Sequence, residues 1–469
     1  MKNFRLAIFL FALIFVCVNC IGFFGSARAT GTDGVVVPAE FASFSSKYVL
    51  LYEAKSGKVL YEKRGYEKAY PASTTKVLTA IIAIEKGDLE AEVTIGDRVE
   101  TKGSSMGLKP GERLKLKDLL YGMMLVSGND AARAIAEHIS GSVADFAVIM
   151  NEYCATLGMK DTQFKNPNGL DNTEHFTTAY DLALASAYAM KNPTFRQVVS
   201  TQVHTIPSTN RHSEGFILEN TNRFIHKKVD DKKSFLYEYA TGIKTGDTMF
   251  AGKCIVTSAK KGDMELIAVL FGDMDDNSTI GENRYVAAKS LFDFGFNNFE
   301  LVNIADLGLS NTVTCNVSDS LIKQTTLNID LENSFACIPK SDVQDIRENA
   351  SKLGLKIVLS NSESENELKA PVDAGEAVGS LQYLYNDEVI FTAALTTSEK
   401  IQKSDESTSA GQEVEAVEPP ETPYYSWLFW LLTASIGIVI VIVVIQLSRR
   451  KPRRAKYSRP NKYRVRRRM

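Results

Sequence analysis

Residues of the types used in nucleophilic catalysis stand three positions apart in Ser73-Thr74-Thr75-Lys76. Pro71, a residue favoured at the first position of a helix, precedes them, and an apolar helical stripe continues beyond the lysine. Side chains three residues apart share one face of a helix, so the Ser73 hydroxyl and the Lys76 amine are predicted to meet. A lysine can accept the serine proton when desolvation and nearby positive charge lower its pKa. The pattern therefore predicts acyl transfer through Ser73. The Ser73 N–H, at a helix start, is expected to face the developing oxyanion.

A second motif, Ser127-Gly128-Asn129, lies between two predicted helices. A loop at this place can project both polar side chains into a cleft. We expect Ser127 to relay a proton toward the leaving amine, and Asn129 to hold Lys76 and the substrate amide.

The third motif, Lys244-Thr245-Gly246, is predicted at the end of a strand. Gly246 would let the substrate approach the backbone closely, while Lys244 and Thr245 present donors to an anionic group. The Lys244 charge would also lower the pKa of Lys76. Each motif alone is common by chance, but the three in this order indicate one active site.

The elements that must position these motifs are a hairpin, a set of helices and a group of strands. The hairpin joins Tyr48–Glu53 to Lys58–Glu62, and apolar spacing predicts helices over Thr75–Glu85, Leu116–Val126 and Ala131–Ile139. Strands are predicted at Glu238–Ile243, Lys253–Ala259 and Met264–Phe271. Strands at both ends with helices between predict an α+β domain over residues 30–300, an antiparallel sheet with a helical lobe.

The remainder of the exported chain divides into a β-rich domain and a linker. Residues 301–396 show short strands with a helical insert near Val343–Leu353. Residues 397–423 are rich in Ser, Glu, Thr and Pro, which predicts a disordered stalk.

Both chain ends carry membrane-related signals. Residues 1–29 read as a signal peptide, with the apolar run Leu6–Val18 followed by a small-residue cleavage site that ends at Ala29; an uncleaved anchor is the alternative. Trp427–Leu447, within a segment 424–448, is long enough to cross a bilayer as one transmembrane helix. Residues 449–469 form a basic tail that is expected to stay in the cytoplasm. The sequence therefore predicts a single-pass protein of the cell membrane whose catalytic domains lie on the extracytoplasmic side.

Charge and metal-binding residues exclude several function classes. Without the three basic residues of the leader and the twelve of the tail, 39 bases face 56 acids, a net charge near −17. We therefore expect no nucleic-acid partner, and the position of the basic tail directly after a span favours a membrane role over a nucleic-acid one. The five histidines lack ligand spacing, so no metal or other cofactor is inferred. Cys315 and Cys337 could form a disulfide in an oxidising exterior, or remain free and buried.

Together the three motifs resemble those of the low-molecular-mass penicillin-binding proteins, the serine D-alanyl-D-alanine carboxypeptidases of peptidase family S11. The resemblance extends over about residues 48–300, and more loosely over 370–395. It is carried also by Asn166-Pro167-Asn168-Gly169-Leu170-Asp171, by His175 with Thr178-Ala179-Tyr180-Asp181-Leu182, and by Gly295-Phe296 with Phe299-Glu300.

This resemblance implies a penicillin-binding/β-lactamase-like transpeptidase fold and a serine hydrolase that trims the cell wall. Ser73 would form an acyl-enzyme with a peptidoglycan stem peptide, release the terminal D-alanine and be freed by water, while β-lactams would be covalent inhibitors. By position Arg284 would face the substrate carboxylate, helped by Thr248, and the Asp247 N–H would complete the oxyanion hole. Asp247 and a true membrane span depart from the family pattern, since an acid beside an anion site opposes binding.

Three other functions would use part of the same pattern. A β-lactamase needs a glutamate that positions water, and no Glu-x-x-Leu-Asn pattern stands between Asn129 and Lys244. A DD-endopeptidase or transpeptidase would use the same acylation chemistry. A catalytically silent peptidoglycan-binding scaffold is disfavoured because the residues that carry the chemistry are all intact: Ser73, Lys76, Ser127 and Lys244.

Overall fold

The computed structural model describes residues 35–404, except 100, 228, 230–232, 275–281, 332–333 and 361–365. The predicted signal peptide, most of the stalk, the transmembrane segment and the basic tail lie outside these residues. Within the described ranges, no helix has the length and apolar character needed to cross a membrane.

A five-stranded antiparallel sheet of order β2-β1-β9-β8-β7 forms the centre of the first domain. It brings the N-terminal hairpin beside strands that come about 200 residues later, as the sequence predicted. The central strand β9 is buried along its whole length, which matches its nearly continuous apolar sequence. Its strands are β1 (Tyr48–Glu53), β2 (Val59–Lys63), β7 (Ala240–Thr248), β8 (Gly252–Lys261) and β9 (Met264–Asp273).

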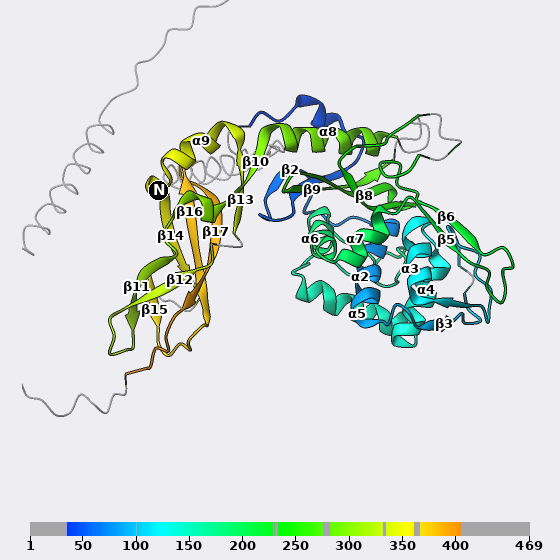
Figure 1. Cartoon of the computed structure of the whole chain (residues 1–469), viewed down its shortest axis with the longest axis horizontal. Coiled ribbons are helices and arrows are strands. Elements are labelled where there is room, and N and C mark those ends of the chain that lie inside the picture. Colours follow the sequence, from blue (N-terminus) through cyan, green and yellow to red (C-terminus); the bar gives the residue numbers. More distant parts are fainter. Residues whose placement is uncertain are drawn as a thin grey trace, which may run out of the picture. The chain divides into compact units, whose positions relative to one another are not determined.

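The two faces of this sheet bury different cores because side chains alternate along each strand. Leu50 and Tyr52 of β1 face the helical lobe, whereas Val49 and Leu51 pack on the opposite side with α8 (Asn283–Asn298). Figure 1 shows α8 lying across one face and the helical lobe on the other.

The helical lobe carries the first two motifs. It contains a 3-10 turn, η2 (Ala72–Thr75), followed by α2 (Lys76–Lys86), α3 (Leu116–Leu125), α4 (Asn129–Ser140), α5 (Val143–Thr156), α6 (Ala179–Met190) and α7 (Pro193–Ser200). The first three of these helices lie within about two residues of the predicted ranges. Two small hairpins join the lobe: β3 (Glu92–Thr94) with β4 (Arg113–Lys115), and β5 (Val203–Ile206) with β6 (Phe216–Glu219).

The second domain has its own core and a six-stranded sheet of order β14-β16-β17-β12-β11-β15. The predicted helical insert is α9 (Lys340–Glu348) with η4 (Ala350–Lys352). A separate two-stranded sheet pairs β10 (Phe299–Asn303) with β13 (Phe335–Pro339). The other elements are η3 (Ile304–Leu307), β11 (Thr312–Ser318), β12 (Gln324–Ile329), β14 (Gly354–Leu359), β15 (Glu367–Lys369), β16 (Ala377–Tyr385) and β17 (Glu388–Thr397); a 3-10 turn η1 (Ala39–Ser43) precedes β1.

The structure corrects the predicted start of the stalk and decides between the two alternatives for Cys315 and Cys337. The first residues assigned to the stalk belong to the second domain: Ile401 is fully buried and bridges to Val372, because the chain turns back onto the sheet after β17. Cys315 and Cys337 do not form a disulfide with each other, and each is buried in a different hydrophobic cluster.

Candidate active site

Ser73 and Lys76 meet at the junction of η2 and α2, as their spacing predicted. The Lys76 Nζ donates a hydrogen bond of 2.7 Å to the Ser73 Oγ. Ala72, immediately before the serine, has a φ of 48°, a left-handed conformation that is uncommon outside glycine. The backbone at the serine is therefore held in a tight, irregular turn before the regular helix begins.

Lys76 is fully buried, and its amine is surrounded by neutral oxygens. Its Nζ donates to the Asn129 Oδ1 at 2.7 Å, to the Asn168 carbonyl at 3.0 Å and to the Ser127 Oγ at 3.4 Å. Burial, followed by the positive charge of Lys244, lowers the pKa of Lys76 well below its usual value, while Asp130 acts in the opposite direction. An uncharged amine at this place can accept the Ser73 proton.

The second motif is in the predicted loop, between the end of α3 and the start of α4. Ser127 has a φ of 63°, which turns the chain sharply before Asn129 begins α4. The Asn129 Nδ2 donates to the Lys102 carbonyl at 2.7 Å, and its backbone N–H donates to the Ser104 carbonyl at 2.8 Å. Asn129 is thus fixed at both ends while its side-chain oxygen accepts from Lys76.

The third motif lies within β7, not at its end as predicted, because pairing with β8 continues through Thr248 opposite Gly252. Lys244 is fully buried, and its Nζ donates to the Thr245 carbonyl at 3.1 Å. Burial and then the nearby charge of Arg284 lower the pKa of Lys244 to about 7. The Thr245 hydroxyl lies 3.1 Å from that of Thr221, a residue that sequence reasoning did not find.

Glycine is required where two segments pack against the turn that carries the nucleophile, residues Ala72–Thr75, which we call the serine turn. A Cβ on Gly246 would lie 3.0 Å from the Ala72 Cβ and 3.1 Å from the Ser73 nitrogen. A Cβ on Gly169 would lie 1.8 Å from the Ala72 carbonyl oxygen, and Gly169 has a φ of 80°. Strand β7 and the loop around residue 169 therefore pack on the turn at backbone distance.

The two residues that follow the third motif stabilise the end of β7. Asp247 forms an ion pair with Lys253 across the β7–β8 ladder. The Thr248 hydroxyl accepts a hydrogen bond of 3.2 Å from the Ala251 N–H, closing the turn. The negative charge that departs from the family pattern is thus compensated by a lysine on the neighbouring strand.

Arg284 lies near the start of α8 and contacts the sheet. Its Nη1 donates to the carbonyls of Gly246 at 2.9 Å and Cys254 at 2.8 Å, and its guanidinium lies over the Tyr285 ring. The alternative surface pairing with Glu282 is not observed, since Glu282 pairs with Arg223 and Lys233. Asp276, the other alternative partner, lies outside the described residues. Arg284 thus braces β7 and acts electrostatically on Lys244.

The Asn168 carbonyl is a participant that the sequence did not reveal. The oxygen accepts a hydrogen bond from the Lys76 Nζ at 3.0 Å, and it also lies 3.5 Å from the Ser73 Oγ. The Asn166 side chain holds the loop by accepting from the N–H groups of Asn168 at 3.3 Å and Gly169 at 2.7 Å. The Asn-Pro-Asn-Gly sequence signals such a turn, but a backbone carbonyl has no residue-type signal of its own.

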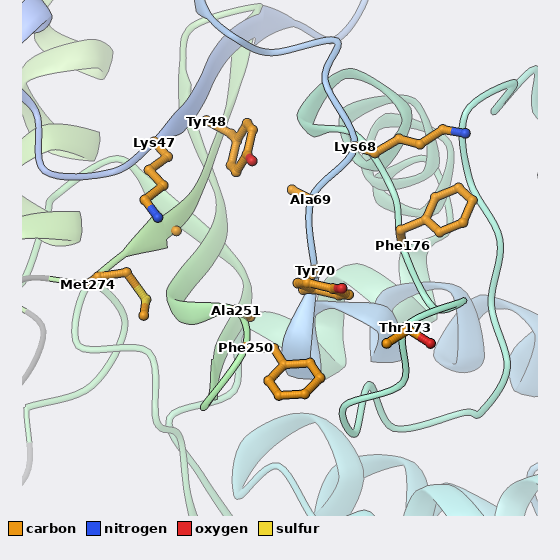
Figure 2. Close-up of a pocket in the computed structure, with 11 residues that line it drawn as sticks. Lys47, Tyr48, Lys68, Ala69, Tyr70, Thr173, Phe176, Phe250, Ala251 and Met274 are labelled. Carbon is orange, nitrogen blue, oxygen red and sulfur yellow. The ribbon is translucent and has the colours of Figure 1, made fainter.

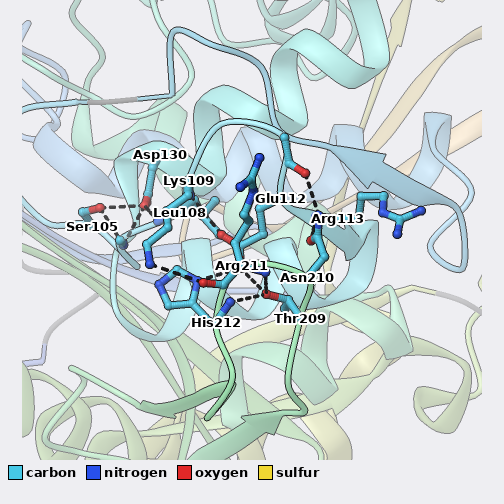
Figure 3. A network of polar contacts seen from close by, with 12 residues as sticks. Ser105, Leu108, Lys109, Glu112, Arg113, Asp130, Thr209, Asn210, Arg211 and His212 are labelled. Carbon is cyan, nitrogen blue, oxygen red and sulfur yellow. Dashed lines mark hydrogen bonds and ion pairs between the residues drawn. The ribbon is translucent and has the colours of Figure 1, made fainter.

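Asp130 is a second participant that was missed. Its buried carboxylate accepts hydrogen bonds from the Ser105 hydroxyl at 2.6 Å and from the N–H groups of Met106, Gly107 and Leu108 at 2.9–3.0 Å. Figure 3 shows this loop continuing into contacts with the β5–β6 hairpin, where buried Glu112 accepts from the Thr209 hydroxyl and pairs with His212. The loop that holds Asn129 is therefore tied down on both sides.

His175 supports the serine turn without titrating near neutral pH. Its Nδ1 accepts from the Lys165 N–H at 3.0 Å, so its Nε2 carries the proton and donates to the Thr75 hydroxyl at 2.9 Å. Burial lowers the pKa of His175 to about 3.

A cavity of about 490 Å³ lies beside the segment that leads to Ser73. Figure 2 shows Tyr70 and Phe250 together on one side of it and Lys47 and Met274 on another. None of the side chains that contact the Lys76 amine lines this cavity. Within the part of the chain that the structure describes, no cluster of three or more acidic, histidine or cysteine side chains is placed to hold a metal ion.

Comparison with known families agrees with this site. The family described as D-alanyl-D-alanine carboxypeptidase matches residues 35–275, and the family described as penicillin-binding protein 5, C-terminal domain, matches residues 312–403. The first match includes the serine turn and the whole catalytic sheet and ends before α8, and the second includes the six-stranded sheet.

Individual relatives cover most of the chain. The D-alanyl-D-alanine carboxypeptidase DacF of Bacillus subtilis is 30% identical over 366 residues, which are 76% of this chain and 86% of the relative. DacC of Escherichia coli is 28% identical over 381 residues, 78% of this chain and 86% of the relative. The structure of penicillin-binding protein 5 from Haemophilus influenzae matches with a TM-score of 0.61 and 27% identity, and it covers 79% of this chain and 100% of that one. With a serine turn, a buried lysine and a family match over more than half its length, the chain belongs to the D-alanyl-D-alanine carboxypeptidase family.

Proposed function

We propose that this protein hydrolyses the terminal D-Ala-D-Ala bond of peptidoglycan stem peptides through an acyl-enzyme on Ser73. The observation that carries the proposal is the buried Lys76 amine, 2.7 Å from the Ser73 Oγ and within reach of no carboxylate in the described contacts. Neutral Lys76 takes the hydroxyl proton as the Ser73 Oγ bonds to the carbonyl carbon of the penultimate D-alanine.

Collapse of the tetrahedral intermediate requires a proton on the leaving amine. Ser127 is assigned this relay because its hydroxyl accepts a hydrogen bond of 3.4 Å from the Lys76 Nζ and so lies next to the base. Asn129 orients Lys76 and binds the substrate amide. The N–H groups of Ser73 and Asp247 are assigned to the oxyanion, and water then frees Ser73 by the same proton path.

Recognition of the terminal carboxylate is assigned to Lys244 and Thr245, with Thr248 and Arg284 in support. Arg284 already donates from Nη1 to two backbone carbonyls, so its part is to fix β7 and add positive charge. Gly246 allows the substrate backbone to lie along the strand. β-Lactams, whose carboxylate and reactive carbonyl match these two functions, are expected to acylate Ser73.

We further propose that the enzyme is a single-pass membrane protein whose catalytic domains lie outside the cell. The leader, the apolar segment 427–447 and the basic tail support this arrangement by sequence pattern. Cell fractionation with protease added from outside tests it: the catalytic domains should be digested in intact protoplasts and the tail should be protected.

The enzymatic proposal is tested by two assays on the purified exported domains. Labelling with a fluorescent penicillin should be covalent, and a pentapeptide ending in D-Ala-D-Ala should yield free D-alanine. Penicillin labelling without D-alanine release would favour a transpeptidase or endopeptidase, which cross-linked dimeric peptides and an added amine acceptor would then reveal. Loss of both activities would indicate a peptidoglycan-binding scaffold.

A further inference from the structure

A second cavity, of about 280 Å³, lies beside the loop that receives Ser73 and Lys76. Asn168 belongs to both places: its carbonyl accepts from the catalytic pair, and the residue also lines the cavity. The proposed mechanism uses no other residue of this cavity. Its walls come from α4, the start of α5 and the segments near residues 101 and 170.

Arg133 provides the positive charge in this cavity. It lies four residues after Asn129 on α4, so both side chains leave the same face of the helix, about 6 Å apart along its axis. Its Nε donates to Glu137 at 2.8 Å, whereas its two Nη groups have no protein partner among the residues that the structure describes. The side chain is 27% exposed, so those groups remain accessible.

Two other features of the cavity suit a small acidic side chain. Thr101 lines the cavity, and its hydroxyl has no hydrogen-bond partner within the described residues; because its oxygen is buried, the side chain must rotate toward the cavity to donate to an anion. Val143 and Leu170 supply apolar contacts for methylene groups. A guanidinium holds a carboxylate through two parallel hydrogen bonds, which a carboxamide cannot reproduce with equal charge.

The peptide direction that the proposed function implies is the link between this cavity and the substrate. The proposed function puts the terminal carboxylate at Lys244 and Thr245 on β7, so the residues before the scissile bond leave the cleft past another wall. The loop containing Asn168 borders the reacting centre, since the Asn168 carbonyl lies 3.5 Å from the Ser73 Oγ, and it also lines the cavity. We propose, resting on the proposed function, that this cavity is a specificity subsite in which Arg133 and Thr101 bind a side-chain carboxylate on the residue that precedes D-Ala-D-Ala.

The test uses two peptides ending in D-Ala-D-Ala that differ only in this side chain, one with a terminal carboxylate and one with the matching carboxamide. The wild-type enzyme should favour the carboxylate in kcat/KM by about tenfold or more. Arg133→Gln should reduce this ratio to about one. Lys289→Gln, which breaks an i,i+4 ion pair on α8 far from the cavity along the chain, is the matched control and should keep the wild-type ratio.

Glu137→Gln separates binding from a structural role of the arginine. Removing this acid frees Arg133 from its competitor, so the ratio should stay or rise, whereas a merely structural ion pair predicts that both variants lose activity on both peptides alike. Penicillin labelling of each variant verifies folding. A wild-type ratio of one, or a preserved ratio in Arg133→Gln, would overturn the subsite. Failure of the wild type to release D-alanine from either peptide would instead overturn the proposed function, and the subsite with it.

Discussion

Two fully buried lysines control the charge of the cleft at the residue scale. Burial disfavours the charged form of both, and the Lys244 charge further lowers the pKa of Lys76. The oxygens that contact the Lys76 amine are all neutral, and the charge of Asp130, which favours the ammonium form, is outweighed by burial and Lys244. The two lysines therefore have different roles in the proposed mechanism: Lys76 is the base, and Lys244 supplies positive charge.

Substitution of the nucleophile and the base should separate chemistry from charge. Ser73→Ala is expected to remove both penicillin labelling and D-alanine release, with little change in stability, because little packing is lost. Lys76→Arg keeps a positive charge but should also be inactive, since a guanidinium is not deprotonated in a protein. Covalent labelling of Ser73→Ala, or near-normal acylation of Lys76→Arg at neutral pH, would move these roles elsewhere.

Neutralising Lys244 should shift the acid limb of the pH profile. Lys76 acts when neutral, so activity falls as the pH drops through its pKa, and removal of the Lys244 charge should raise that pKa. In Lys244→Met, the acid limb of the penicillin acylation rate should therefore move to higher pH, in addition to an overall loss of rate. Lys260→Met removes an exposed lysine near the far end of the adjacent strand β8 and should leave the limb in place. An unshifted limb in Lys244→Met would refute the coupling.

The serine turn is the element on which the other elements converge. Strand β7 contacts it at Gly246, the loop at Gly169 approaches the Ala72 carbonyl, and His175 bonds to Thr75. The loop after residue 101 holds Asn129 from the other side. Catalytic geometry therefore depends on backbone contacts between segments that are far apart in the sequence.

Gly246→Ala is expected to displace β7 from the serine turn. The new methyl group would press on the Ala72 Cβ and the Ser73 nitrogen, so kcat/KM should fall about tenfold or more for a displacement of a few tenths of an ångström to 1 Å. Gly354→Ala on edge strand β14, where the nearest atom lies 3.3 Å away, is the control and should retain activity. Equal kcat/KM in both variants would mean that the close approach is not needed.

Asp130→Asn should loosen the loop that holds Asn129. An amide cannot accept all the hydrogen bonds that the buried carboxylate receives, so the free energy of unfolding should fall by about 2–4 kcal/mol and acylation should slow. Asp145→Asn, in the first turn of α5 but exposed, should cost less than about 1 kcal/mol. Thermal unfolding and penicillin acylation rates measure both effects. Similar values for the two variants would contradict the role of Asp130 in holding this loop.

At the scale of the whole molecule, three hydrophobic clusters support two domains. The helical lobe and α8 cover opposite faces of the catalytic sheet, and the second domain buries its own set of apolar residues. This second domain includes the chain up to Ser404, since Ile401 packs on it. The segment that we predict to act as a flexible stalk is therefore residues 405–423.

Shortening residues 405–423 should reduce the reach of the enzyme from the bilayer. As a flexible chain this segment would span about 25 Å on average and about 60 Å when extended. Deletions within it should lower activity on intact cell wall but not on a soluble pentapeptide. Deleting 397–404 should instead lower the melting temperature, because it removes buried Thr397 and Ile401. Equal loss on both substrates after a 405–423 deletion would place that segment in the folded enzyme.

The sequence alone determined the chemistry that depends on local spacing. The three-residue interval between Ser73 and Lys76 placed both side chains on one helical face, and period-two and 3.6-residue patterns located the hairpin and the helices around them. Tertiary structure decided what local patterns do not encode: the contact of the Asn168 carbonyl with Lys76, the hydrogen bonds of the Asp130 carboxylate, the position of the third motif inside β7, and the backbone contacts of Arg284. These depend on main-chain atoms and on segments brought together by packing, and a backbone carbonyl is chemically the same at every position until the fold gives it a neighbour.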